Sequence, residues 1–140
     1  MFIASRYHDI SCGHRVVGHE NKCRHLHGHN YRVHFDVTSN HTDEIGRVVD
    51  FSVIKSELCM WLEDNWDHKM LIWSSDPLLE GLQLLDNSSI VVVPFNPTAE
   101  NMAKYLVEVI GPTKLSHKSL TLSKVTIEET MKCSATYYKD

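Results

Sequence analysis

Histidine is concentrated near the start of this 140-residue chain, which holds ten histidines, seven of them between His8 and His34. His27 and His29 stand two residues apart where a strand is expected to begin. Side chains two residues apart in extended backbone share a face, with Cα atoms about 7 Å apart, a separation that two ligands of one metal ion can bridge. These two histidines are therefore candidate metal ligands.

A third ligand is available at His14, which ends a strand-like segment over residues 1–13. It joins His27 and His29 if the two strands pair as a hairpin with a long loop. Three neutral imidazoles leave the fourth tetrahedral position of zinc open for water or substrate, as in catalytic sites. The alternatives are that the spacing reflects ordinary strand histidines, because H-x-H alone is a weak motif, or that the cluster binds metal adventitiously.

Cys23 lies four residues before His27 in a polar loop, between Lys22 and Arg24. The two flanking positive charges favour the thiolate over the thiol, which would make the sulfur a usable acid or base. The alternative is that Cys23 is a fourth zinc ligand, which would close the site and give it a structural role. The spacing leaves both interpretations open.

Glu129 has the same strand parity as the apolar residues Val125 and Ile127, so its carboxylate is expected on the inward face while Glu128 points outward. A buried carboxylate needs a partner. A ligand with two parallel N–H donors, such as the edge of a pterin or guanine ring, would suit it as arginine does. A salt bridge, or a strand register shifted by one residue, is the alternative.

Asp67 and His68 place an acid beside an imidazole where a turn is expected. Adjacent residues of an extended strand point to opposite faces, so the two side chains can cooperate only if the backbone turns there. By itself this dipeptide is common and has little meaning.

The hydrophobic pattern predicts strands and helices in a simple order. Strict alternation over residues 31–39 indicates a half-buried strand, and two further strands are expected at residues 121–129 and 133–139. Between them, Asp50 or Ser52 caps a helix that ends near Trp66.

Thr98 caps a second helix, which Gly111 and Pro112 are expected to end. The order β-β-α-α-β-β predicts an α+β fold, with a four-stranded antiparallel sheet and two helices on one face.

Composition narrows the class of protein further. The length suits a single domain over residues 1–140, and the net charge of −4 argues against nucleic acid as a partner. The N-terminal segment lacks the features of a signal peptide, and there is no run of about 20 apolar residues that would span a membrane. We expect a cytoplasmic protein whose cysteines are reduced.

Six motifs, taken together, resemble the family of 6-pyruvoyltetrahydropterin and 6-carboxytetrahydropterin synthases. Each motif is weak alone, but all six occur in the family's order and span nearly the whole chain. They are SCGHRV, HGHNY, GRVVDFS, WDHK, PTAEN and EET.

The resemblance implies a role for each candidate residue. The zinc ligands would be His14, His27 and His29, the catalytic residues Cys23, Asp67 and His68, and the substrate-binding residues Glu129, Thr98 and Glu100. It also implies the tunnelling fold (T-fold), in which subunits join into a barrel, usually as a homohexamer of two stacked trimers. Active sites then form between subunits, so that Asp67 and His68 of one chain serve Cys23 of another.

Within the family, the C-x3-H-x-H spacing from Cys23 to His29 resembles the 6-carboxytetrahydropterin synthases of 7-deazaguanine (preQ0, queuosine) biosynthesis. The expected reaction converts 7,8-dihydroneopterin triphosphate to 6-carboxy-5,6,7,8-tetrahydropterin, with Zn²⁺ as cofactor. One alternative is 6-pyruvoyltetrahydropterin formation, and another is a non-catalytic module that binds zinc or pterin. A zinc-stabilised nucleic-acid binder is disfavoured by the acidic charge.

Overall fold

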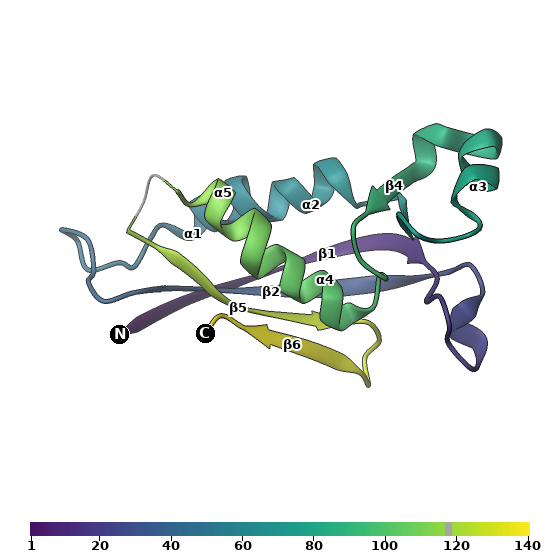
Figure 1. The fold of residues 1–140 in the computed structure, drawn as a ribbon. Coiled ribbons are helices and arrows are strands. Elements are labelled where there is room, and N and C mark those ends of the chain that lie inside the picture. The colour runs from purple at the N-terminus through teal and green to yellow at the C-terminus, as the bar shows by residue number, and fades with distance from the viewer. Residues whose placement is uncertain (117–118) are drawn as a thin grey trace.

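A computed structural model describes residues 1–116 and 119–140 (Figure 1). Within this part of the chain, six strands form one sheet in the order β4-β3-β1-β2-β5-β6. The strands are β1 (Phe2–His14), β2 (His27–Ser39), β3 (Met70–Trp73), β4 (Ile90–Val93), β5 (Thr121–Glu128) and β6 (Ser134–Tyr138). β1, β2, β5 and β6 pair antiparallel, as expected, whereas β3 and β4 are parallel additions at the edge of β1.

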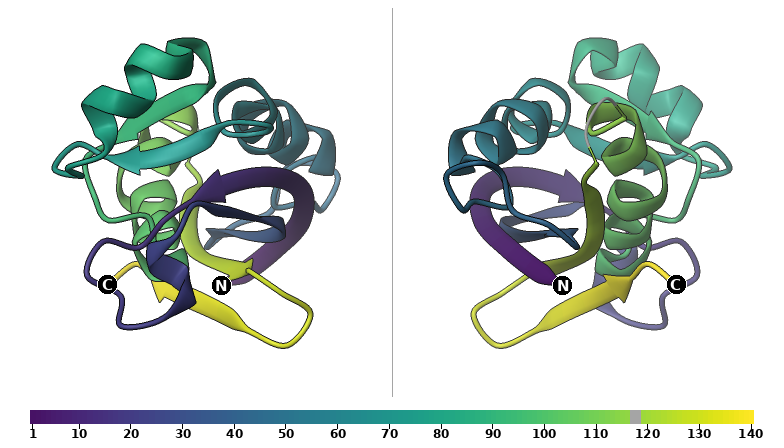
Figure 2. Two further views of the ribbon diagram at one scale, coloured as in Figure 1. Left: turned by 90° about the vertical axis from the view of Figure 1, so that its right-hand side faces the viewer. Right: turned by 90° about the vertical axis from the view of Figure 1, so that its left-hand side faces the viewer.

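Two long helical segments cover one face of the strongly curved sheet (Figure 2). The first consists of α1 (Phe51–Ile54), a π-helical stretch (Lys55–Cys59) and α2 (Met60–Asn65). The second consists of α4 (Ala99–Tyr105), a π-helical stretch (Leu106–Ile110) and α5 (Gly111–Lys114). The remaining helical elements of the described residues are α3 (Leu79–Asp86) and two 3₁₀ turns (Lys22–Arg24 and Asn87–Ser89). No helix in the described ranges is long and apolar enough to cross a membrane.

The predicted caps of both long helices are confirmed. The Asp50 side chain accepts a hydrogen bond from the Ser52 backbone N–H, and the Thr98 hydroxyl accepts one from the Asn101 N–H. The core lies between the sheet and these helices, because the alternation of β2 turns Tyr31, Val33, Phe35 and Val37 inward, and these side chains are buried.

The prediction of a four-stranded sheet is wrong. It missed β3 and β4, whose sequences MLIW and IVVV are apolar runs of four residues each. Such short runs carry no alternation, so periodicity cannot distinguish a strand from part of a buried helix. β3 matters for the site because its pairing with the end of β1, at Gly13 and His14, fixes that end of the strand in the sheet.

The prediction that Gly111 and Pro112 end the second helix is also wrong, because the helix continues to Lys114. The Gly111 N–H donates to the Leu106 carbonyl, closing the π-helical stretch, and Pro112 then occupies the first turn of α5, where a missing N–H is tolerated. A Cβ atom on Gly111 would lie 2.8 Å from the Leu122 Cβ, so glycine allows this helix to pack closely on β5.

We expect Gly111→Ala to destabilise the protein although alanine is the better helix former. The added methyl group overpacks the contact with Leu122, which typically costs about 1–3 kcal/mol. Urea unfolding followed by circular dichroism measures the change. The matched control is Gly81→Ala in α3, where a Cβ would meet nothing within 4 Å, and which should be neutral or stabilising by up to about 1 kcal/mol. Equal effects in the two variants would contradict the packing argument.

Candidate metal centre and active site

The pairing of β1 with β2 brings the three candidate histidines together. In the antiparallel register His14 lies opposite His27, and Cys12 lies opposite His29. The ring centroid of His14 is 4.5 Å from that of His27 and 5.2 Å from that of His29, and the His27 and His29 centroids are 4.9 Å apart. The prediction that these strands pair as a hairpin is therefore confirmed, and the three rings form one cluster on the helix-covered face.

Backbone carbonyls orient two of the rings. The Nδ1 atom of His14 is 2.6 Å from the Pro97 carbonyl oxygen, and that of His27 is 2.7 Å from the His25 carbonyl oxygen. A carbonyl oxygen only accepts, so in both neutral rings the hydrogen is on Nδ1 and the Nε2 atom presents a lone pair. Nothing in the sequence pointed to Pro97, since a contact between residues 83 positions apart cannot be read from local spacing.

The three Nε2 atoms are buried, and none has a hydrogen-bond partner among the described residues. Buried polar atoms normally have partners, because an unsatisfied one costs about 1–3 kcal/mol. Three such nitrogens in one cluster are unfavourable unless a cation lies between them. The donor set therefore fits a bound metal ion, and imidazole nitrogen is a preferred zinc ligand.

Glu129 completes this group. Its Oε1 atom lies 2.7 Å from Nε2 of His29 and 3.6 Å from Nε2 of His14. One ligand atom from each of the four residues lies within 4.8 Å of the others. The expected strand parity is confirmed, since Val125 and Ile127 are buried while Glu128 contacts His34 on the opposite face. However, the Glu129 carboxylate lies where we expected the fourth coordination position of a zinc ion to be open.

The charge states of this group suit a metal site. Burial lowers the pKa of His29. This shift favours a neutral imidazole near neutral pH, which is the form that binds metal ions.

Cys23 lies in the 3₁₀ turn between β1 and β2, half buried and free of any disulfide. The four-residue group around the histidine nitrogens includes Glu129 and not Cys23. The turn is held by Arg15, which donates to the Arg24 carbonyl at 2.9 Å and to the buried Asp76 carboxylate at 2.7 Å. Arg24 is likewise used within the loop, where it donates to the Asn21 carbonyl at 2.9 Å.

The backbone turns at Asp67 and His68, just after α2, and this turn brings the two side chains together as their cooperation requires. His68 has a left-handed backbone with φ of 59°, and its Nδ1 lies 2.8 Å from Asp67 Oδ2. Ser11 of β1 holds the pair in place, because its N–H donates to Asp67 Oδ1 at 2.9 Å and its carbonyl accepts from the His68 N–H at 2.6 Å. Burial alone raises the pKa of Asp67, but the Ser11 and His68 interactions together hold it below the usual value.

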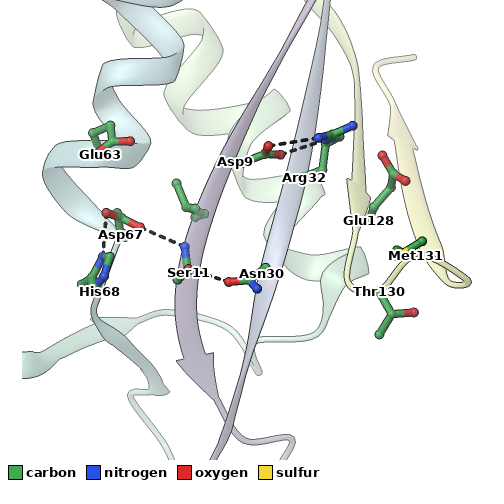
Figure 3. Close-up of a pocket in the computed structure, with 11 residues that line it drawn as sticks. Asp9, Ser11, Asn30, Arg32, Glu63, Asp67, His68, Glu128, Thr130 and Met131 are labelled. Carbon is green, nitrogen blue, oxygen red and sulfur yellow. Dashed lines mark hydrogen bonds and ion pairs between the residues drawn. The ribbon is translucent and has the colours of Figure 1, made fainter.

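This pair opens onto a cavity of about 700 Å³ that does not contain the metal-binding group. Figure 3 shows Asp67 and His68 beside Ser11 and Asn30, which belong to the sheet face opposite the three histidines. The His68 side chain is 81% exposed. The 700 Å³ cavity therefore does not join this pair to the metal-binding group, although His68 and His29 both line a second cavity of about 450 Å³.

The remaining candidates lie at the start of α4. The Thr98 hydroxyl is occupied as the helix cap, at 3.1 Å from the Asn101 nitrogen. Glu100 lines a cavity of about 150 Å³ together with Glu129 and Cys133. This cavity adjoins the metal-binding group through Glu129, so Glu100 and Glu129 come together although 29 positions separate them in the sequence.

Fold and site together define an α+β protein whose paired long strands carry three histidines that form a candidate metal-binding group with Glu129, just after β5. The family model described as 6-pyruvoyl tetrahydropterin synthase matches residues 3–140. The chain belongs to this family.

Relatives and solved structures agree with this assignment. The chain is 33% identical to the 6-carboxy-5,6,7,8-tetrahydropterin synthase of Rickettsia felis, over 95% of this chain and 97% of the relative. An uncharacterized protein from Wolinella succinogenes has a similar structure, with a TM-score of 0.88 and 25% identity over 99% of this chain and 98% of the other. The Caenorhabditis elegans 6-pyruvoyl tetrahydropterin synthase superposes with a TM-score of 0.71 and 26% identity, over 99% of this chain and 96% of the other.

Measuring bound zinc in variants distinguishes a metal ligand from a residue that only lies near the metal. We expect His27→Ala to lose bound zinc, because one of three imidazole ligands is gone, whereas Cys23→Ala keeps both zinc and fold. Metal content after dialysis, measured by mass spectrometry, and circular dichroism together test this. Loss of zinc from the Cys23→Ala protein would show that the sulfur is a ligand and the site is of the closed, structural kind.

Proposed function

We propose that this protein is a zinc-dependent 6-carboxy-5,6,7,8-tetrahydropterin synthase that acts on 7,8-dihydroneopterin triphosphate in cytoplasmic 7-deazaguanine biosynthesis. The observation that carries the proposal is the convergence of three buried imidazole nitrogens that have no hydrogen-bond partner among residues 1–116 and 119–140. Curated relatives with this name cover nearly the whole chain at about one-third identity, which supports the choice of reaction.

Zinc, when bound by His14, His27 and His29, supplies a Lewis acid and a template for the side-chain hydroxyls of the substrate. Cys23 and His68 move protons between that side chain and the pterin ring. Asp67 orients His68, which the 2.8 Å contact between them and the hydrogen bond from Ser11 support.

Three further residues bind the substrate ring. Glu129 accepts hydrogen bonds from the 2-amino and ring N–H edge of the pterin. Thr98 and Glu100 complete this part of the site, supported by the cavity that Glu100 and Glu129 share.

The proposal includes a homohexamer of two stacked trimers, in which the sheet of each subunit contributes to a barrel. Asp67 and His68 open onto the sheet face opposite their own metal-binding group, and His68 is largely exposed. This placement supports an active site in which the pair from one subunit serves Cys23 of a neighbour. In such a hexamer, Asp67 and His68 would contact the substrate bound to the neighbouring subunit.

The reaction is tested by incubating protein of known zinc content with 7,8-dihydroneopterin triphosphate and identifying the products. We expect 6-carboxytetrahydropterin, triphosphate and acetaldehyde. Formation of 6-pyruvoyltetrahydropterin would contradict the proposed activity and show that the protein is a 6-pyruvoyltetrahydropterin synthase. Recovery of unchanged substrate from protein with a full zinc complement would favour a non-catalytic pterin-binding module.

Sharing of the site between subunits predicts complementation. Cys23→Ala and His68→Ala should each lower activity by about 10²–10⁴-fold, the usual contribution of an acid or base group. When the two variants are co-assembled at random, about a quarter of the sites regain both groups in a symmetric ring, so activity should return to roughly that fraction of the wild-type value.

Co-assembly of Cys23→Ala with Cys23→Ser is the control and should restore nothing. Native mass spectrometry of differently tagged chains confirms that mixed oligomers have formed. Mixed oligomers that stay inactive in the Cys23 and His68 pairing would contradict the shared site.

A further inference from the structure

Glu129 lies between the three-histidine cluster and a neighbouring cavity, which the proposed reaction assigns to the metal and to the pterin ring. On one side its Oε1 atom faces the imidazole nitrogens of His14 and His29, and on the other it lines the 150 Å³ cavity with Glu100 and Cys133. Its backbone is fixed, because the Glu129 N–H donates to the Cys133 carbonyl at 3.0 Å. Only rotation of the side chain is therefore needed to turn the carboxylate from one space toward the other.

The contact with the imidazoles lacks hydrogen-bond geometry. Although Oε1 of Glu129 is 2.7 Å from Nε2 of His29, that nitrogen has no hydrogen-bond partner in the described part of the chain. The Nε2 atom of His14 carries a lone pair, because its Nδ1–H faces a carbonyl oxygen. The Glu129 carboxylate and the His14 imidazole thus meet acceptor to acceptor, which is repulsive until a cation lies between them.

The distances agree with a shared cation. Zinc bonds to nitrogen and oxygen of about 2.0–2.2 Å place neighbouring ligand atoms of a tetrahedron about 3.4 Å apart. The separations of 2.7 and 3.6 Å between Glu129 and the two nitrogens bracket that value. His27 belongs to the same group, since all four ligand atoms lie within 4.8 Å of one another.

We infer that Glu129 is the fourth ligand of the metal in the substrate-free protein and that binding of the pterin ring draws its carboxylate off the metal. The bond between Glu129 and the metal breaks, and the carboxylate gains two N–H···O hydrogen bonds from the ring edge. A hydroxyl oxygen of the substrate side chain takes the vacated position. The displacement rests on the proposed function, whereas the ligation does not.

This arrangement couples ring recognition to access at the metal. Without a ring in place, three imidazoles and one carboxylate fill a tetrahedral zinc and leave no position for water. A two-donor ring edge matches a carboxylate in the bidentate manner of arginine, which provides the competing interaction. Glu129 is thereby a specificity-determining residue. A molecule without the two N–H donors of the ring edge does not displace its carboxylate, so no coordination position becomes free at the metal.

The test uses Co²⁺-substituted protein, whose visible absorption reports the number and type of metal ligands. The variant is Glu129→Gln, with Glu129→Asp as a second variant that keeps the carboxylate if the first fails to fold. The matched control is Glu128→Gln, since the adjacent Glu128 carboxylate contacts His34 on the opposite face. The probe is pterin itself, which has the ring edge but no side-chain hydroxyls that could bind the metal.

We expect Glu129→Gln to change the Co²⁺ spectrum and to weaken zinc binding by more than about tenfold, a loss that even outer ligand partners produce, while Glu128→Gln changes neither. Pterin should shift the wild-type spectrum and leave that of Glu129→Gln unchanged. Identical wild-type and Glu129→Gln spectra would overturn the ligation and support a plain ion pair between Glu129 and a protonated His29.

Two further outcomes concern the displacement. Pterin that binds, as judged by quenching of its fluorescence, without altering the wild-type Co²⁺ spectrum would overturn it. Failure of pterin to bind the wild-type protein would overturn it as well. The product assay then decides separately whether the proposed activity stands.

Discussion

The antiparallel register of β1 and β2 is the constraint on which the rest of the site depends. Thirteen residue pairs join these strands, and they place His14 opposite His27 at the loop end of the hairpin. A shift of one residue in either strand would turn its histidines to the opposite face, because strand side chains alternate. The buried residues Tyr31, Val33 and Phe35 oppose such a shift, since it would move them into solvent.

Helix α4 and the segment before it contribute the second part of the site. The Thr98 cap fixes where α4 begins, and the preceding Pro97 carbonyl holds the His14 ring through its Nδ1–H. A ring oriented in this way presents its other nitrogen to a metal with little loss of freedom on binding. Pro97, which the sequence indicated only as part of the PTAEN motif, therefore orients a candidate metal ligand.

Asp67 and His68 depend on β1 in the same way. The Ser11 backbone binds both residues, three positions before His14 in the same strand. One strand thus carries the candidate metal-binding histidine on one face and holds the acid/base pair along its hydrogen-bonding edge, beside the cavity on the opposite face. A pair that opens onto that face can act at a histidine cluster that a neighbouring copy of the chain brings to the cavity, which is the physical reason for proposing a shared site.

The sequence was informative where local chemistry decides the structure. The alternation of β2, the Asp50 and Thr98 caps and the inward parity of Glu129 are all found as predicted. It was uninformative where tertiary contacts decide. β3 and β4 are too short to show a period, and the close contact of Gly111 with Leu122 cannot be read from a residue that usually ends helices.

X-ray absorption at the zinc edge of the substrate-free protein tests the central claim most directly, because it reports which atoms surround the metal. The account predicts one zinc per chain with nitrogen and oxygen ligands alone, at about 2.0–2.2 Å. A sulfur at about 2.3 Å would show that a cysteine occupies the fourth position, and it would contradict the account.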